Sequence, residues 1–430
     1  MTSILIYNGI LVTMKKVDDI LFNAYVYIED DKIVDYGKYE DMPEEYKMAE
    51  LVINAKGRII IPALTAAYVN IDFYPIRFKC FSKNPHEWYE EVELKYLNRY
   101  KHEYSEYALK LVLYNLINQG VASVCGSIRS LQFDLSKLRK TGLNIILAKT
   151  LSKNNVENEI KEISNINEDV KKETEDRIKL AIALAQTLLL DDYVVNALSE
   201  SLGNKPLEIG LILEVAKVKE EISQYKQKYQ KRPVEYLDSK GLLTQNTMLT
   251  HCTWVTLREI KLLAKSNSSI ILCPESSLSL NEGIPPVMDI VNSKVKYTLG
   301  LDKGPSYNVF NLIRETLTIH NVLYGSSRSL DAYELLKSIT IAPKTILNVG
   351  NRGIIEKGYK ADIAIFRADP KEALVYSSTN IYELLVYGML SLETLIANGE
   401  IIVDGGQQLV FTDEEIEKSS EELSQLIEEV

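Results

Sequence analysis

The chain has 430 residues, of which 46% are hydrophobic and 25% are charged, and this balance is typical of a globular protein with a large core. Its net charge of −11 argues against nucleic acid as a partner, because phosphate binding requires a basic face. No segment approaches the roughly 20 apolar residues that span a membrane, and the first residues alternate around Asn8-Gly9, unlike a signal peptide. We therefore expect a cytoplasmic protein.

Residues 1–61 carry the pattern of short β-strands separated by turns. The runs "ILIYNGILVTM", "AYVYIEDDKIVDYG" and "LVINAKGRIII" are rich in β-branched residues and are interrupted by Asn-Gly, Asp-Asp and Lys-Gly. This part of the chain therefore predicts a small β domain.

From about Leu64 the pattern changes to short apolar runs separated by longer helical segments, such as 105–118. Thr256 and Glu259 have capping-box spacing at the start of one of these helices. The charged run 154–177 indicates a solvated helix and loop. Strands followed by helices predict an α/β fold, a (β/α)8 barrel whose strand ends meet at one mouth. The eight strands should end near Asn70, Cys125, Ala148, Leu184, Glu214, His251, Cys273 and Asp302.

Strand patterns return after the barrel, in residues 360–369 and 392–406, with Asn-Gly and Gly-Gly turns. We expect residues 1–61 and 352–411 to form one composite β-sandwich domain and residues 62–351 to form the barrel. Residues 412–430 read as an amphipathic C-terminal helix.

Several stretches resemble the amidohydrolase superfamily, in the subgroup of cytosine, guanine and adenosine-type deaminases and chlorohydrolases. "VINAKGRIIIPAL" is similar to the family's entry into the first barrel strand. Residues 249–287, from "LTHCTW" to "NEGIPPV", are similar to its passage through strands six and seven, and "TLGLDKG" is similar to its strand-eight metal segment. The resemblance covers nearly the whole chain and implies the barrel and the small domain. It does not by itself define an activity.

The resemblance implies a Zn²⁺ or Fe²⁺ centre held by two histidines after strand one, one after strand five, one after strand six and an aspartate after strand eight. In this chain the strand-one positions are Tyr68 and Asn70, and the strand-five position is Glu214. The family's proton-shuttling glutamate falls on Lys217, and its substrate-contacting histidine falls on Ala185. His251 and Asp302 are retained.

Two interpretations of this altered site remain open. In the first, the Lys217 ammonium replaces the metal and neutralises Glu214 and Asp302, because unpaired buried charge is strongly unfavourable. We then expect Lys217 within hydrogen-bonding reach of one of them, and no metal. In the second, Glu214, His251 and Asp302 hold a divalent metal such as zinc or iron. The remaining histidines, His86, His102 and His320, are interpreted as surface or packing residues.

Three functions follow from these interpretations. The first is an amidohydrolase-type scaffold that has lost metal-dependent hydrolysis and serves as a pseudoenzyme or ligand-binding protein. The second is metal-free acid–base chemistry in a rebuilt site, with Tyr68 and the candidate catalytic residues Lys217, His251 and Asp302 as the acid–base groups. The third is a hydrolase of non-peptide C–N bonds with an altered metal site. Tyr68, Asn70, Glu214 and Trp254 are the expected ligand-pocket residues, a small molecule is the expected ligand, and the resemblance implies a homodimer.

Overall fold

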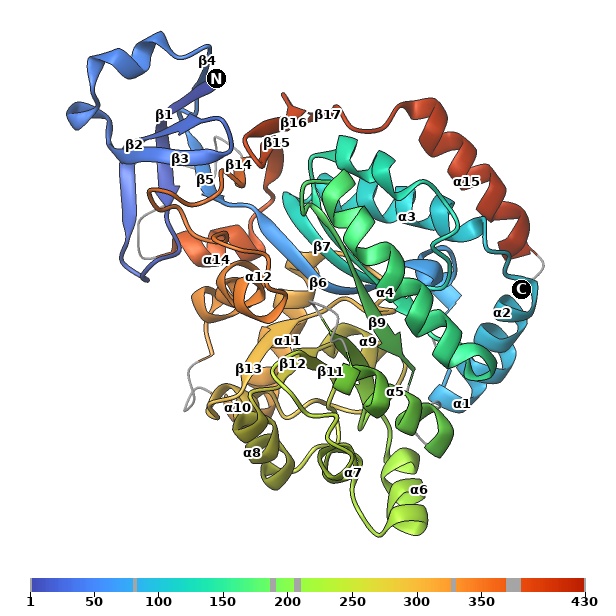
Figure 1. Cartoon of the computed structure of the whole chain (residues 1–430). Coiled ribbons are helices and arrows are strands. Elements are labelled where there is room, and N and C mark those ends of the chain that lie inside the picture. The colour runs from blue at the N-terminus through green and yellow to red at the C-terminus, as the bar shows by residue number, and fades with distance from the viewer. Residues whose placement is uncertain are drawn as a thin grey trace.

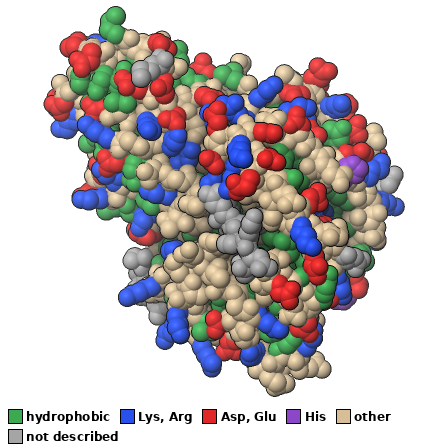
Figure 2. Space-filling view, in the orientation of Figure 1, with side chains coloured by type: hydrophobic (Ala, Val, Ile, Leu, Met, Phe, Trp, Pro, Cys, Tyr) green, Lys and Arg blue, Asp and Glu red, His purple; other side chains and the backbone are tan. Residues whose placement is uncertain are grey.

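The computed structural model describes residues 2–79, 83–185, 191–204, 210–325, 330–368 and 380–428. Within these ranges the chain forms two bodies of secondary structure, a barrel and a smaller sheet domain beside it (Figure 1). No described helix combines the length and apolar character that a membrane crossing requires. Acidic and basic side chains are interspersed over the face in Figure 2, so the excess negative charge is not gathered into one patch there.

Eight parallel strands form the barrel in the order of the chain. Leu301 and Asp302 donate backbone hydrogen bonds to the carbonyl of Tyr68, and Asn70 donates one to Asp302, so the last strand segment closes onto the first. The strands are β6 (Leu64–Asn70), β7 (Val121–Ile128), β8 (Asn144–Thr150), β9 (Ile178–Leu184), β10 (Leu211–Val215), β11 (Thr247–His251), β12 (Ser269–Leu272) and β13 (Lys296–Leu299).

The barrel strands are almost entirely buried because helices cover the outside and apolar side chains fill the inside. The interior holds small and medium residues such as Ala67, Cys125, Ile146, Met248 and Cys273. The α-helices between β6 and the end of the barrel are α1 (Pro85–Trp88), α2 (Leu94–Arg99), α3 (Tyr104–Ile117), α4 (Val156–Glu173), α5 (Asp192–Asn204), α6 (Lys219–Tyr229), α7 (Pro233–Ser239), α8 (Leu257–Ser266), α9 (Pro274–Ser279), α10 (Val287–Val291), α11 (Val309–Tyr324) and α12 (Ala332–Ile346).

The smaller domain is built from both ends of the chain, as the sequence predicts. Among the described residues, nine strands are joined in one hydrogen-bonded sheet, in which β5 from the N-terminal part pairs with β14 from the C-terminal part. The strands are β1 (Ser3–Val12), β2 (Ile20–Glu29), β3 (Lys32–Lys38), β4 (Leu51–Asn54), β5 (Arg58–Pro62), β14 (Ile363–Arg367), β15 (Ser391–Ala397), β16 (Glu400–Asp404) and β17 (Gln407–Gln408). This sheet domain and the parallel barrel confirm the predicted fold class.

Two helices complete the described chain. Helix α14 (Ile381–Tyr387) precedes β15, and α15 (Asp413–Glu428) runs along the barrel beside α3 (Figure 1). Leu423 and Leu426 are buried on the inner face of α15, as expected for an amphipathic helix. Residues 429 and 430 of the predicted C-terminal helix lie outside the described residues.

Candidate active site at the barrel mouth

The ends of β10, β11 and the segment after β13 have an unusual backbone. Ala216, His251, Cys252 and Asp302 have positive φ angles of 51°, 65°, 52° and 45°. Such conformations cost non-glycine residues of order 1–3 kcal/mol each and cluster at functional sites. The strained residues therefore indicate a functional site at the mouth of the barrel, where these strand ends meet.

Glu214, His251 and Asp302 converge at this mouth. One donor atom from each residue lies within 4.8 Å of the others, and all three side chains are buried. His251 Nε2 lies 3.4 Å from Asp302 Oδ2. The sequence expectation that the ends of β10, β11 and the strand-eight segment bring these three residues together therefore agrees with the structure.

Several polar atoms of this group make no hydrogen bond within the described structure. They include both ring nitrogens of His251 and Oδ1 of Asp302. The other Asp302 oxygen accepts a hydrogen bond from Ser276 Oγ at 2.7 Å, and Tyr68 donates to Glu214 at 3.4 Å. A buried polar atom without a partner costs about 1–3 kcal/mol, so these atoms fit a bound cation.

The protonation states of the group also suit a cation. Burial, with help from the Lys217 ammonium, lowers the pKa of His251 to about 4, so its ring is neutral at pH 7 and keeps a free lone pair. Burial alone would raise the pKa of Asp302, but its electropositive surroundings lower it overall. The lowering comes from His251 first, then from Lys217, Lys303 and the Ser276 hydrogen bond. One imidazole and two carboxylates form a donor set that divalent metals accept.

Lys217 does not make the contact that the first interpretation requires. Its ammonium lies 3.1 Å from Glu282 Oε1, and no hydrogen bond or ion pair joins it to Glu214 or Asp302 in the described structure. Burial would lower the pKa of Lys217, but the nearby carboxylates, Glu282 first, raise it well above its ordinary value. The expectation that Lys217 pairs with Glu214 or Asp302 is therefore wrong, because a third carboxylate pairs with it instead.

Sequence reasoning missed Glu282. It lies in the loop between α9 and α10, and its second oxygen faces His251 Nδ1 at 3.6 Å. Burial raises the pKa of Glu282 to about 7, with Lys217 opposing the shift and Asp302 adding to it. One signal was available in the sequence. Lys217 stands where the family has a glutamate, and Glu282 is an acidic residue within a stretch that resembles the family. Nothing local in "LNEGIPPV" indicates that its side chain turns inward.

Lys303 makes a second, partly buried ion pair beside the site. Its ammonium contacts both oxygens of Glu93, at 3.1 and 3.0 Å, and lies 4.2 Å from the centre of the Phe73 ring. Glu93 belongs to the segment between α1 and α2 that follows the first barrel strand. The Lys303 charge is thus compensated by Glu93, and Lys303 does not occupy the Asp302 carboxylate.

The space left in the mouth is small. A cavity of about 30 Å³ lies beside Tyr68, Asn70, Ala185 and Glu214. Trp254, an expected pocket residue, does not line this cavity, and its indole donates a hydrogen bond to the Glu282 carbonyl at 2.7 Å. A cavity of this size holds about one water molecule, so an organic ligand requires side chains around the mouth to move.

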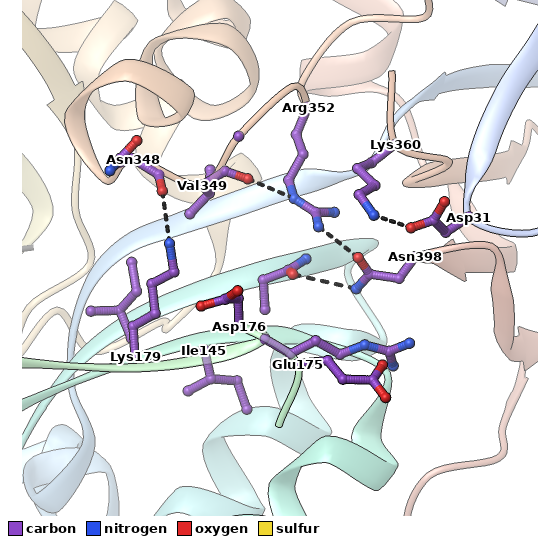
Figure 3. Close-up of a pocket in the computed structure, with 14 residues that line it drawn as sticks. Asp31, Ile145, Glu175, Asp176, Lys179, Asn348, Val349, Arg352, Lys360 and Asn398 are labelled. Atoms are coloured by element: carbon purple, nitrogen blue, oxygen red, sulfur yellow. Dashed lines mark hydrogen bonds and ion pairs between the residues drawn. The ribbon is translucent and has the colours of Figure 1, made fainter. Parts of the chain in front are cut away.

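A larger cavity of about 470 Å³ lies at the opposite end of the barrel, against the small domain (Figure 3). Several of its charged groups have partners. Arg352 pairs with Asp362 and donates to Asn398 at 2.6 Å, and Lys360 pairs with Asp31. Among the described residues, no metal-ligand group of the kind found at the mouth lines this cavity. It is therefore interpreted as part of the contact between barrel and small domain.

The barrel, the composite sheet domain and the buried polar group at the mouth define a class of proteins. The family model described as the amidohydrolase family matches residues 59–401, and the chain belongs to this family.

More specific relatives are deaminases. The chain is 24% identical over 413 residues to 5-methylthioadenosine/S-adenosylhomocysteine deaminase of Clostridium tetani, with 94% of each chain covered. It is 25% identical over 406 residues to the enzyme of the same name from Pyrococcus furiosus, covering 91% of this chain and 93% of the relative.

Solved structures share the fold at low sequence identity. An adenosine deaminase from Xanthomonas campestris with bound zinc has a TM-score of 0.86 at 17% identity, with 100% of this chain and 99% of that chain covered. A guanine deaminase from C. acetobutylicum with bound guanine has a TM-score of 0.76 at 18% identity, covering 93% and 100%. These likenesses establish the fold, and the departures at Tyr68, Asn70, Glu214 and Lys217 distinguish this chain's site from the family pattern described above.

Proposed function

We propose that the chain is a metal-dependent hydrolase of non-peptide C–N bonds, with Glu214, His251 and Asp302 as the metal ligands. One observation carries this proposal. Three buried donor atoms lie within 4.8 Å of one another, and both ring nitrogens of His251 and Oδ1 of Asp302 make no hydrogen bond in the described structure. The expectation that no metal binds rested on a Lys217 contact that the structure does not contain.

A dication would also relieve repulsion. Two carboxylates about 5 Å apart repel each other by on the order of 3 kcal/mol at an effective dielectric constant near 20. Glu214 and Asp302 approach this separation, and the nearby Lys217 is paired with Glu282. The charge of the donor group therefore favours a bound cation.

The chain's own residues have defined tasks in this proposal. When bound, the metal supplies an activated water near neutral pH. Tyr68 stays protonated, because burial and the nearby Glu214 raise the pKa of its hydroxyl, and it orients Glu214 through a hydrogen bond. Ser276 holds one oxygen of Asp302. Glu282 pairs with the Lys217 ammonium at 3.1 Å and faces His251 Nδ1 beside the donor group.

The names of the relatives suggest the first substrates to try. Ammonia release should be measured with 5-methylthioadenosine, S-adenosylhomocysteine, adenosine and guanine after loading with Zn²⁺, Fe²⁺ or Mn²⁺. We expect turnover that depends on the added metal and is lost in His251→Asn. Absence of turnover with all four substrates and all three metals would count against this proposal.

A ligand-binding protein without hydrolytic activity is the second candidate. It is favoured by Tyr68 and Asn70 in place of the two strand-one histidines and by the 30 Å³ cavity in the mouth. The homodimer and the cytoplasmic location stay predictions. Metal content separates the two functions, because the second candidate needs no metal.

A further inference from the structure

Glu282 faces two members of the mouth at once. Its side chain is 2% exposed, with Oε1 3.1 Å from the Lys217 ammonium. Its Oε2 lies 3.6 Å from His251 Nδ1 and makes no hydrogen bond in the described structure. One carboxylate thus stands between a buried cation and a proposed metal ligand.

The loop around Glu282 is fixed on both sides. The Glu282 N–H donates to the Ser277 carbonyl at 2.8 Å, and its own carbonyl accepts from the Trp254 indole at 2.7 Å. The next residue, Gly283, has a φ of +119°, and a Cβ there would lie 2.5 Å from the Trp254 ring. The loop therefore presents the Glu282 side chain in one direction, and glycine at 283 is required for the close approach.

Lys217 has other acidic neighbours to which it could turn. Glu214 is three residues earlier in the same segment, and both Glu214 and Asp302 act electrostatically on the Lys217 ammonium. A buried ammonium without its partner is strongly unfavourable, so loss of the Glu282 charge would draw Lys217 toward these two carboxylates. An ammonium in that position would occupy the space that a metal needs.

We infer that Glu282 is a positioning residue that holds the Lys217 ammonium away from Glu214 and Asp302 and orients His251 with Nε2 toward Asp302. Metal-binding histidines commonly use their second nitrogen in this way, on a neighbouring carboxylate. The inference rests on the proposed metal centre. It explains why a lysine can lie beside a cation site, since its charge is already compensated by a residue outside the donor group.

The test uses Co²⁺, whose visible absorption reports its coordination independently of activity. The metal-free full chain and its variants Glu282→Gln, Lys217→Met and Lys217→Met/Glu282→Gln are titrated with Co²⁺. We expect Glu282→Gln to weaken binding at least tenfold. The double variant should recover to within about threefold of the parent, because the displaced ammonium is gone. Glu159→Gln is the matched control, since it breaks the Lys149–Glu159 ion pair of 3.2 Å outside the donor group and should leave Co²⁺ binding unchanged.

Two results would overturn the inference. Glu282→Gln could bind Co²⁺ as the parent does, or the double variant could remain as weak as Glu282→Gln, as expected of a purely structural residue. If the parent binds no Co²⁺, the proposed function fails. The coupling between Lys217 and Glu282 is then measured from the melting temperatures of the metal-free parent and variants. Additive effects of the two single variants would then show that Lys217 and Glu282 are not coupled and would overturn the inference separately.

Discussion

The two ends of the barrel differ in how their charged side chains are paired. At the end against the small domain, Arg352 pairs with Asp362, 10 residues further along the chain. Lys360 pairs there with Asp31 from the N-terminal part of the chain (Figure 3). At the mouth, Lys217 has one direct carboxylate partner, Glu282, while His251 and Asp302 keep atoms without hydrogen bonds. The ion pairs against the small domain are complete, whereas the donor group at the mouth keeps buried polar atoms without partners.

This difference separates structural from functional charge. A complete pair holds the fold, and removing one partner leaves the other buried and uncompensated. An incomplete set needs something from outside the chain, here a cation. Variants at the two ends should therefore differ in one respect: added metal should change stability only for variants at the mouth.

The largest expected loss of stability is at the end of the barrel that lies against the small domain. Arg352→Met leaves the buried Asp362 carboxylate without its cation, and such a change typically costs about 3–5 kcal/mol. Urea denaturation should report this loss with and without Zn²⁺ alike. Arg177→Met is the control, because its partner Glu400 is 56% exposed and the pair should contribute less than about 1 kcal/mol. Equal losses in the two variants would refute the structural role of Arg352.

Lys217→Ala tests the mouth with the next largest effect. It leaves Glu282, Glu214 and Asp302 without an ammonium, and we expect a loss of about 3 kcal/mol in the metal-free chain. Added Zn²⁺ or Mn²⁺ should reduce the difference in the free energy of unfolding between this variant and the parent. Lys219→Ala, which removes a cation 4.4 Å from the Trp254 ring, should lose less than about 1 kcal/mol. A Lys217→Ala variant that melts like the parent and gains nothing from metal would contradict this account.

Asp35 supplies a smaller, pH-dependent test within the small domain. Burial alone would raise its pKa, but hydrogen bonds from Lys357 and Tyr25 lower it overall. A lowered pKa stabilises the fold above the unfolded-state value near 3.9, and this contribution is lost as the pH falls through the folded-state value. Asp35→Asn should therefore cost about 1–2 kcal/mol at pH 7. The difference from the parent should close below about pH 4.

Thermal unfolding of both proteins between pH 3 and 7 measures this difference. Glu40→Gln is a suitable control, because Glu40 is exposed and its pair with Lys38 spans 3.8 Å. A constant gap between Asp35→Asn and the parent across the whole pH range would exclude the Asp35 carboxylate as its source.

The sequence is informative where the signal is local. Strand periodicity places His251 and Asn70 at the ends of β11 and β6, and capping-box spacing places Thr256 at the start of α8. It is less informative where side chains choose partners across the fold. Lys217 lies three residues from Glu214 but pairs with Glu282, 65 residues further along the chain. Tertiary packing decides that choice, and no periodic pattern encodes it.

The burial of His320 is also decided by tertiary packing. Its position in a helical pattern left surface and packing roles open, and the structure buries it in α11 beside Tyr324. Glu93 was not singled out, because its contact with Lys303 depends on how the segment after β6 folds over the mouth. Single-sequence patterns predict which elements form, while the ion pairs depend on how these elements are arranged.

The most direct test of the central claim is elemental analysis of the full chain and of His251→Asn, both expressed with added Zn²⁺, Fe²⁺ and Mn²⁺. The incomplete charge at the mouth predicts about one divalent metal ion per parent chain and a large loss of metal in His251→Asn, with both proteins folded by circular dichroism. A parent chain that carries no metal, or a variant that retains as much as the parent, would contradict the claim that Glu214, His251 and Asp302 form a cation site.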